Sequence, residues 1–393
     1  MTSPPERTPF LTDRLQGFGT TIFTAMSALA TETGAVNLGQ GFPDTDGPAA
    51  VMDAAVEAIR AGANQYPPLP GLPVLRQAIA GHRRHHRGQS FDPDSEVLVT
   101  TGATEALAAA LLALTGPGDE VVTFEPYYDS YAAGIAMSGA TRRVVTLRGR
   151  DFAFDPAELA AAFTARTRVL LLNSPHNPTG KVFDRVELEQ IAGLCREHDV
   201  IAVTDEVYEH LVYDGSHIPL ATLPGMAERT ITISSAGKIF SFTGWKIGWA
   251  CGPAPLIDAV RTAKQFLTFA SGGPWQRAIA VGLGLGDDYF RGYTATMQAK
   301  RDLLCAGLVA AGFDVIVPAG TYFATVDIRS VGASDGVEFC MALPRTAGVV
   351  AVPTQVFYDD VDAGRHLVRF AFCKQDDVLE EACRRLLAAE GFR

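Results

Sequence analysis

The chain has 393 residues, of which 47% are hydrophobic and 20% charged, and its formal net charge is −11. This length exceeds one hydrophobic core of ordinary size, so we expect two domains, one of them smaller. The acidic balance disfavours nucleic acid and anionic membranes as partners, and the apolar content argues against a disordered chain.

The N-terminal residues and the cysteines favour a cytoplasmic location. Residues 1–10 carry prolines and charges where a signal peptide needs an apolar core, and no run reaches the roughly 18 apolar residues of a membrane span. The six cysteines form no C-x-x-C pair, which is typical of buried thiols in a reducing compartment. We therefore expect neither disulfides nor a bound metal.

The one basic run, HRRHHR at His82–Arg87, lies before the first clear strand pattern. A run of charges usually marks the solvated face of a helix, and we expect that here. Its histidines have no carboxylate or cysteine near them in the sequence that would suggest a metal site.

Between about Val97 and Ala250, apolar runs alternate with helical stretches such as Thr104–Leu114. The runs predicted as strands buried on both faces are Glu96–Gly102, Glu120–Pro126, Arg143–Leu147, Arg168–Pro175, Val200–Glu206 and Thr230–Ser235. The short run Ile247–Gly252 is predicted as a further strand, and it could run antiparallel to the others. This alternation predicts an α/β fold with a mostly parallel sheet flanked by helices.

After Gly286 the pattern changes to short strands among helices. The expected helices are Asp288–Ala311, Val337–Leu343 and Val378–Ala389, and the expected strands are Thr321–Ile328, Gly348–Val352 and His366–Phe372. We expect a large domain at residues 47–286 and a small α+β domain at 287–393. Residues 1–46 would form an N-terminal arm and part of the small domain.

Candidate site residues follow the predicted strands, where ligands collect in sheets of this kind. Gly102-Ala103-Thr104 opens a helix directly after a strand, which would suit a phosphate, although many such turns bind nothing. The loop Asn173–Gly180, which contains Asn177, fits either a rigid site loop or an ordinary turn-rich connection.

Three charged residues stand in apolar surroundings. Asp205 ends a buried strand and needs a partner, either an internal cation or a protonated ring nitrogen of a ligand. Lys238 lies among small and aromatic residues, and burial beside a second cation, Lys246, would lower its pKa. Arg369 lies within the strand HLVRFAF and calls for a carboxylate, from a substrate or from the protein.

The motifs VNLGQGFPD, NSPHNPTG, TDEVYEHL, SSAGKIFSFTGWKIGW and LVRFAFCK occur in this order over nearly the whole chain. In them the sequence resembles the class I/II aminotransferases, which are fold-type-I enzymes dependent on pyridoxal 5'-phosphate. The resemblance is closest to the N-succinyldiaminopimelate aminotransferases and to the kynurenine/glutamine transaminase branch. It implies a seven-stranded, mostly parallel sheet in the large domain and a homodimer.

The resemblance also implies a role for each candidate residue. Lys238 would form the Schiff base with the cofactor and move the substrate proton, and Asp205 would pair the ring nitrogen. Tyr208 and Asn177 would bind the ring oxygen, with Tyr128 against the ring face. The phosphate would be bound by Gly102, Ala103, Thr104, Ser235, Lys246 and, from the partner subunit, Tyr66. Arg369, with Gly41 and Asn177, would bind the substrate carboxylate.

The implied reaction moves an α-amino group between an L-amino acid and a 2-oxo acid in two half-reactions. N-succinyl-L,L-diaminopimelate with glutamate/2-oxoglutarate, in lysine biosynthesis, is the expected substrate pair, and Arg14 is a candidate for the distal carboxylate. A kynurenine-, glutamine- or methionine-type transaminase and a cysteine-conjugate β-lyase are the alternatives. The loop Thr268–Ser271 lacks the histidine of the kynurenine type. A regulator that carries such a domain would also need an N-terminal DNA-binding module. The segment before Gly47 is short for such a module, so we do not expect this alternative.

Overall fold

The structure is a computed structural model that describes residues 8 and 10–389. Its largest sheet has seven strands in the order β2-β8-β7-β6-β5-β3-β4. These are β2 (Val97–Thr101), β3 (Glu120–Glu125), β4 (Thr141–Thr146), β5 (Thr167–Asn173), β6 (Ile201–Asp205), β7 (Thr230–Ser235) and β8 (Ile247–Cys251). Only β8 runs antiparallel to its neighbours. The predicted α/β fold with a mostly parallel sheet is confirmed.

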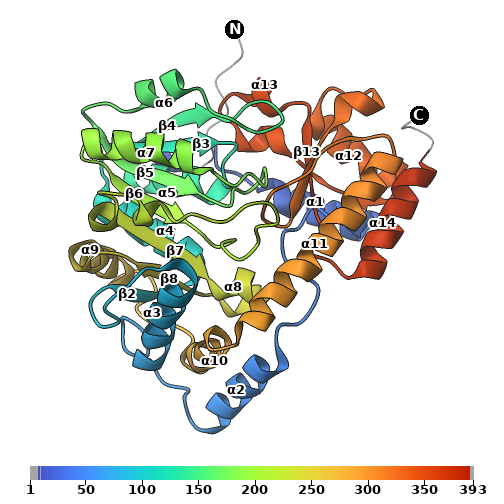
Figure 1. Ribbon diagram of the computed structural model, residues 1–393. Helices are drawn as coiled ribbons and strands as arrows, with labels where there is room; N and C mark the ends of the chain where they lie inside the picture. Colours follow the sequence, from blue (N-terminus) through green and yellow to red (C-terminus); the bar gives the residue numbers. More distant parts are fainter. Residues whose placement is uncertain (1–7, 9, 390–393) are drawn as a thin grey trace.

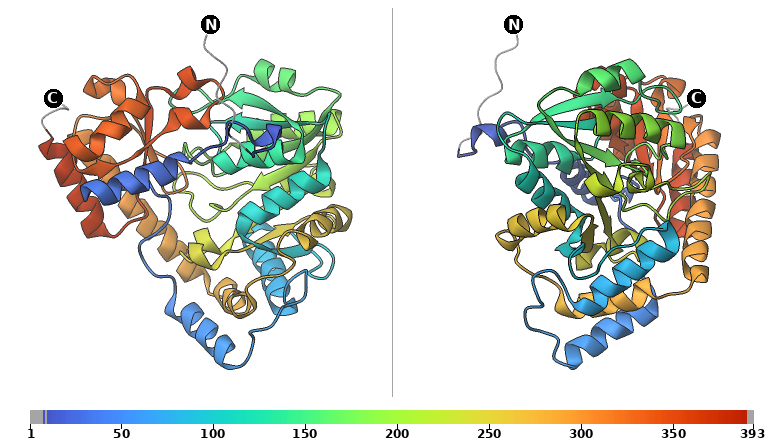
Figure 2. Two further views of the ribbon diagram at one scale, coloured as in Figure 1. Left: turned by 180° about the vertical axis from the view of Figure 1, so that it is seen from behind. Right: turned by 60° about the vertical axis from the view of Figure 1, so that its left-hand side comes forward.

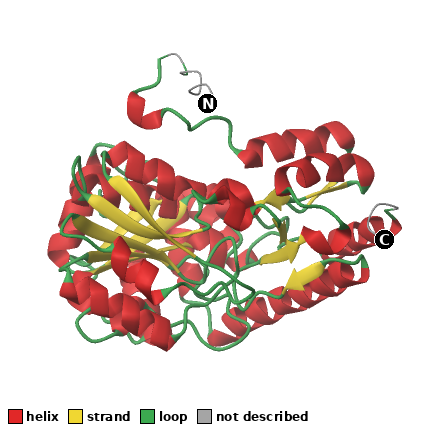
Figure 3. Cartoon of the chain, turned by 90° about the horizontal axis from the view of Figure 1, so that it is seen from above, coloured by secondary structure: helices red, strands yellow, loops and turns green. Residues whose placement is uncertain are grey.

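Helices cover both faces of this sheet, which explains why its strands are almost continuously apolar (Figure 3). One face packs against α4 (Gly102–Leu114), α5 (Asp129–Ser138) and α9 (Ala254–Gln265). The other packs against α6 (Pro156–Ala162) and α7 (Arg185–Glu197). Local signals set the helix starts: Asp184 and Glu187 form a capping box at the start of α7.

Two smaller sheets lie beside the large one, toward the C-terminal end of the chain (Figures 1 and 2). Antiparallel strands in the order β12-β13-β10-β9 form one, and β1 pairs with β11 in the other. Their bounds are β1 (Val36–Asn37), β9 (Asp314–Ile316), β10 (Phe323–Asp327), β11 (Val349–Val350), β12 (Val352–Pro353) and β13 (Leu367–Ala371). The helices around them are α1 (Ile22–Thr33), α11 (Asp287–Ala310), α12 (Gly336–Thr346), α13 (Val361–Gly364) and α14 (Asp376–Ala388).

The pairing of β1 with β11 brings residues near the N-terminus against the C-terminal part of the chain. The domain boundaries at 46/47 and 286/287 stay a prediction, and residues 1–7, 9 and 390–393 lie outside the described residues. Within the described part, no helix has both the length and the apolar character needed to cross a bilayer.

The remaining helices pack near β2 and β8: α2 (Ala49–Arg60), α3 (Pro73–Arg87), α8 (Ala236–Ile239) and α10 (Gly273–Leu283). Short 3-10 turns occur at Asp13–Leu15, Leu220–Thr222, Ala227–Arg229, Thr243–Trp245, Ile328–Val331 and Thr354–Phe357.

The basic run at the end of α3 corrects the sequence analysis. The prediction of a solvated helix face is wrong for His82 and Arg83, which are buried. Arg83 is compensated by Glu206 and Glu209, acidic residues more than a hundred positions away in the sequence. The expectation that these histidines lack a carboxylate neighbour is also wrong, because His85 Nε2 lies 2.7 Å from Asp287 Oδ1.

Candidate active site

A cavity of 300 Å³ lies where the parallel strands of the large sheet end. The site residues predicted from the sequence that line it are Gly41, Gly102, Ala103, Thr104, Tyr128, Asn177, Asp205, Tyr208, Ser235, Lys238, Lys246 and Arg369. Tyr66 does not line it and is 82% exposed on the surface of the chain. The structure thus brings together the residues predicted to be catalytic, to bind the cofactor or to bind the α-carboxylate, with the exception of Tyr66.

The N-terminus of α4 forms the end of the cavity that suits an anion. No side chain caps this helix, and Gly102, at φ +71°, lets the chain turn from β2 into it. A Cβ at Gly102 would lie 3.4 Å from Lys246 Nζ, so that ammonium group stands beside the first turn. The backbone of β8 approaches closely as well, since a Cβ at Gly248 would lie 2.5 Å from the Gly102 carbonyl carbon. Free N–H groups, a helix dipole and a cation together favour a phosphate.

Lys238 projects from α8, directly after β7, into the same cavity. Its Nζ donates hydrogen bonds to the Tyr322 hydroxyl, at 2.8 Å, and to the Gly41 carbonyl, at 3.2 Å. Burial, with Arg369 and Lys246 adding to it, lowers the pKa of Lys238 to about 8. Such an amine is a far better base and nucleophile near neutral pH than an ordinary lysine.

Asp205 ends β6 in the floor of the cavity and is bonded by neutral donors only. The Tyr131 hydroxyl donates to Oδ2 at 2.6 Å, and the Val207 amide donates to Oδ1 at 3.3 Å. Burial raises the pKa of Asp205 to about 6, against the opposing effect of the Tyr131 hydrogen bond. A carboxylate in this state favours a cationic donor such as a protonated ring nitrogen.

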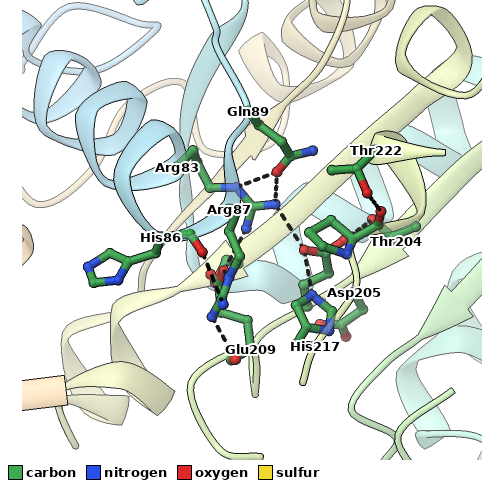
Figure 4. Close-up of polar contacts among 12 residues, drawn as sticks. Arg83, His86, Arg87, Gln89, Thr204, Asp205, Glu209, His217 and Thr222 are labelled. Atoms are coloured by element: carbon green, nitrogen blue, oxygen red, sulfur yellow. Dashed lines mark hydrogen bonds and ion pairs between the residues drawn. The ribbon is translucent and has the colours of Figure 1, made fainter. Parts of the chain in front are cut away.

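Glu206, the next residue, takes the protein's own cation instead. Its carboxylate lies 2.9 Å from Arg83. Figure 4 shows Arg83 beside Glu209, which it contacts at 2.7 Å. Burial alone would lower the pKa of Arg83, but the two carboxylates raise it above its usual range. Glu209 Oε1 in turn accepts a hydrogen bond from Ser234 in β7, at 2.8 Å. This network fixes the backbone behind the site and leaves Asp205 available to a ligand.

Arg369, from β13, is buried at the opposite end of the cavity. Its two terminal nitrogens donate to neutral oxygens, Asn177 Oδ1 at 2.9 Å and the Gly39 carbonyl at 3.0 Å. Within the described residues, Nε is buried without a hydrogen-bond partner. Burial lowers the pKa of Arg369 to about 10. The partners found for this cation are neutral, so the arrangement favours an anionic ligand over the internal carboxylate that the sequence left open.

The loops around Arg369 and Lys238 are held by direct contacts. Asn173 Oδ1 accepts from the Asn177 amide at 2.7 Å, which shapes the loop after β5. A Cβ at Gly41 would lie 2.6 Å from the Phe323 ring, so only glycine fits there. The Phe323 ring lies 4.0 Å from the Arg369 guanidinium carbon. The Phe323 ring therefore packs against the Arg369 guanidinium group and helps to hold it in place.

Three side chains important to this geometry were not singled out from the sequence. Tyr131 lies three residues after Tyr128 in the EPYYDSY segment, where helical spacing could have placed both on one face. Tyr322 and Phe323 follow a turn outside the recognised motifs, so no sequence signal marks them. Arg14, the candidate for the distal carboxylate, is exposed and does not line the cavity, whereas Phe23 does line it.

The large sheet, with Lys238 and Asp205 at the carboxyl ends of its strands and buried Arg369 facing the same cavity, defines an α/β enzyme that acts on a small anionic substrate. The chain belongs to the class I and II aminotransferases, whose family profile matches residues 33–386. It is 54% identical to a Mycobacterium tuberculosis protein named "Probable N-succinyldiaminopimelate aminotransferase", over 95% of this chain and 97% of that one. The solved structure of N-succinyldiaminopimelate aminotransferase from that organism superimposes with a TM-score of 0.94 over 96% of this chain and 99% of that one. The Escherichia coli methionine aminotransferase is 40% identical over 95% of this chain and 97% of its own length.

Proposed function

We propose that this aminotransferase binds pyridoxal 5'-phosphate in the 300 Å³ cavity and uses N-succinyl-L,L-diaminopimelate as amino donor and 2-oxoglutarate as acceptor. The observation that supports the reaction type best is that two cationic side chains line one cavity. The Lys238 amine has its pKa near 8, and the Arg369 guanidinium has an Nε without a partner among the described residues. The donor set fits the cofactor, with an anion site at α4 and a carboxylate without a cationic partner at Asp205.

When bound, pyridoxal phosphate supplies an aldehyde that bonds to amines and a ring that takes up the electrons of a broken Cα–H bond. Lys238 would provide the amine that bonds the cofactor aldehyde, with loss of water. Once the substrate amine displaces it from that carbon, the freed Lys238 amine would take the proton from Cα. Asp205, held by Tyr131, keeps a proton on the ring nitrogen. Arg369 binds the substrate α-carboxylate and so fixes which Cα bond faces Lys238.

The remaining predicted residues position the cofactor. The α4 N-terminus, Ser235 and Lys246 bind its phosphate, while Tyr208 and Asn177 bind the ring oxygen. Tyr128 lies against the ring. The donor identity rests on the relative at 54% identity, since Arg14 does not line the cavity and leaves the cation for a distal carboxylate unassigned.

A substrate panel tests the donor. Purified holoenzyme is supplied with 2-oxoglutarate and, in turn, N-succinyl-L,L-diaminopimelate, methionine, kynurenine or glutamine, and the glutamate formed is measured. We expect kcat/KM for N-succinyl-L,L-diaminopimelate to exceed the others at least tenfold. A higher value for methionine or kynurenine would overturn the donor but not the reaction type. Ammonia and pyruvate released from a cysteine conjugate, without glutamate, would indicate a lyase.

Substitution of Lys238 and Arg369 tests the roles of these side chains. Lys238→Ala should abolish multiple turnover. Arg369→Ala should raise KM for every α-amino acid, since a buried bidentate contact contributes roughly 2–5 kcal/mol. Arg365→Ala, which removes an exposed arginine from the segment before β13, is the matched control and should leave KM unchanged. Equal KM values for the two arginine variants would refute the carboxylate role.

A further inference from the structure

We infer that the last turn of α3 and the first turn of α11 form a binding site for a divalent transition-metal ion of the zinc type, with His85, His86 and Asp287 as ligands. The site lies outside the active-site cavity and takes no part in the proposed transamination.

The three side chains lie so close together that small side-chain rotations would bring one donor atom of each to about 2 Å from a shared ion. His85 Nε2 lies 2.7 Å from Asp287 Oδ1, and the rings of His85 and His86 lie 4.6 Å apart. One donor atom from each residue can be chosen so that all lie within 4.8 Å of one another. Two imidazole nitrogens and one carboxylate oxygen suit zinc, nickel or copper, whereas magnesium and calcium prefer oxygen alone.

The ligands are accessible and one of them is held in place. The side chains of His85 and Asp287 are 63% and 48% exposed, so an ion can reach them without opening the fold. His86 is half-buried, with its ring 4.7 Å from that of Phe290 and 5.1 Å from that of His210. A cavity of 580 Å³ lined by His86 and Asp287 leaves room for waters to complete the coordination.

The neighbouring charges do not oppose a cation strongly. Arg87 is paired with Glu209 at 2.8 Å. Arg291 is paired with Asp288 at 2.5 Å and also lies 3.7 Å from Asp287 Oδ2, so Asp287 Oδ1 is the oxygen that it leaves to an ion. The ionisable groups that face the site are His82, Arg83 and Arg87 from α3, Glu209 and His210 from the segment after β6, and Asp288 and Arg291 from α11.

Metal binding would exchange one hydrogen bond for three coordinate bonds. The His85 ring now lies in hydrogen-bond distance of Asp287, and a neutral ring would shift its proton to Nδ1 so that Nε2 can bind the ion. The simpler alternative is an ordinary histidine–aspartate ion pair that binds no metal.

Zn²⁺ titration of the holoenzyme separates the two alternatives. The protein is purified without a histidine tag, treated with EDTA, and titrated with Zn²⁺ in a calorimeter at pH 7.5. We expect saturable binding of one ion per chain, weakened at least tenfold in His85→Gln and in Asp287→Asn. Zn²⁺ should raise the melting temperature of the unsubstituted protein but not that of the double variant.

The controls keep the result interpretable. Both replaced side chains are exposed, and equal melting temperatures in EDTA will show that the variants fold. His198→Gln, at the end of α7, changes a histidine elsewhere and should leave Zn²⁺ affinity unchanged. The proposal is overturned if no saturable binding occurs, which leaves an ion pair only, or if the double variant binds Zn²⁺ as tightly as the unsubstituted protein.

Discussion

At the scale of single residues, Lys238, Asp205 and Arg369 share one physical condition. Asp205 and Arg369 are buried and Lys238 is half-buried, and removal from water shifts each pKa toward the neutral form, to about 6, about 10 and about 8. Each shift is a free-energy cost of keeping that group charged. A ligand of opposite charge offsets this cost, so the geometry favours a protonated ring beside Asp205 and a carboxylate on Arg369.

Tyr131→Phe should narrow the pH range of activity on its acidic side. The Tyr131 hydroxyl lowers the pKa of Asp205 against the larger effect of burial, so its loss should raise that pKa further. Activity requires ionised Asp205 and falls as the pH drops through this pKa. The acidic limb of the kcat/KM profile should therefore move to higher pH by about one unit, since a hydrogen bond of about 1–1.5 kcal/mol corresponds to about that shift.

Tyr127→Phe provides the matched control for this measurement. It removes a hydroxyl from a nearby tyrosine in the same segment, but that hydroxyl donates to Asp359 and not to Asp205. Its acidic limb should stay where it is in the unsubstituted enzyme. If the two variants shift alike, or if neither shifts, Tyr131 does not tune Asp205.

At the scale of elements, Arg83 ties α3 to the segment after β6. Arg83→Met should lower the free energy of unfolding by roughly 3–5 kcal/mol, because it removes the cation that buried Glu206 and Glu209 share and leaves Arg87 to Glu209 alone. Urea unfolding of the holoenzyme measures this. Arg84→Met, one position further along the same helix, removes an exposed arginine and should change stability by at most about 0.5 kcal/mol. Equal urea midpoints for the two variants would show that the network contributes nothing net.

The strands of the large sheet could be predicted because burial on both faces leaves a direct mark on composition. A continuous apolar run such as β5 or β6 is typical of a strand covered by helices, and the residue at its carboxyl end is then a site candidate. For this reason Asp205, Lys238 and the turn at Gly102 could be predicted as site residues from the sequence alone.

Features that depend on distant partners could not be predicted. Arg83 was expected in solvent because its carboxylates are 123 and 126 residues away. The run Gly348–Val352 was expected as one strand, but it supplies β11 to one sheet and the start of β12 to another, with Ala351 between them. No sequence motif marks Tyr322, because its role depends on the hydrogen bond that its hydroxyl accepts from Lys238, a residue far away in the sequence.

At the scale of the whole molecule, the active site is assembled from both parts of the chain. Lys238 and Asp205 come from the large sheet, whereas Arg369 comes from the four-stranded sheet. Tyr66 lies on the outside, with its ring 5.9 Å from that of Phe269, in a patch that also exposes Phe266 and Leu267. Exposed apolar side chains gathered in this way are typical of an interface, which supports the homodimer that the resemblance to the aminotransferases implies.

If Tyr66 reaches the partner's phosphate site, two defective chains should restore activity when combined. Lys238→Ala lacks the essential amine, and Tyr66→Ala lacks the contact to the partner's cofactor. In a mixed dimer, one site receives Lys238 from one chain and Tyr66 from the other and is complete, while the second site carries both defects. Random pairing makes half of the dimers mixed, so about a quarter of all sites should be complete.

The two variants are co-expressed or refolded together, and activity is then measured at limiting pyridoxal phosphate. Under this condition, dimers of Tyr66→Ala alone should bind little cofactor. The double variant Lys238→Ala/Tyr66→Ala combined with Lys238→Ala contains no complete site and should stay inactive, which controls for contamination. Light scattering on the same samples reports whether dimers form. Every other residue of the proposed cofactor pocket comes from the chain that carries Lys238, so only the placement of Tyr66 decides whether mixing restores activity. If dimers form and activity is not restored, Tyr66 does not belong to the partner's site.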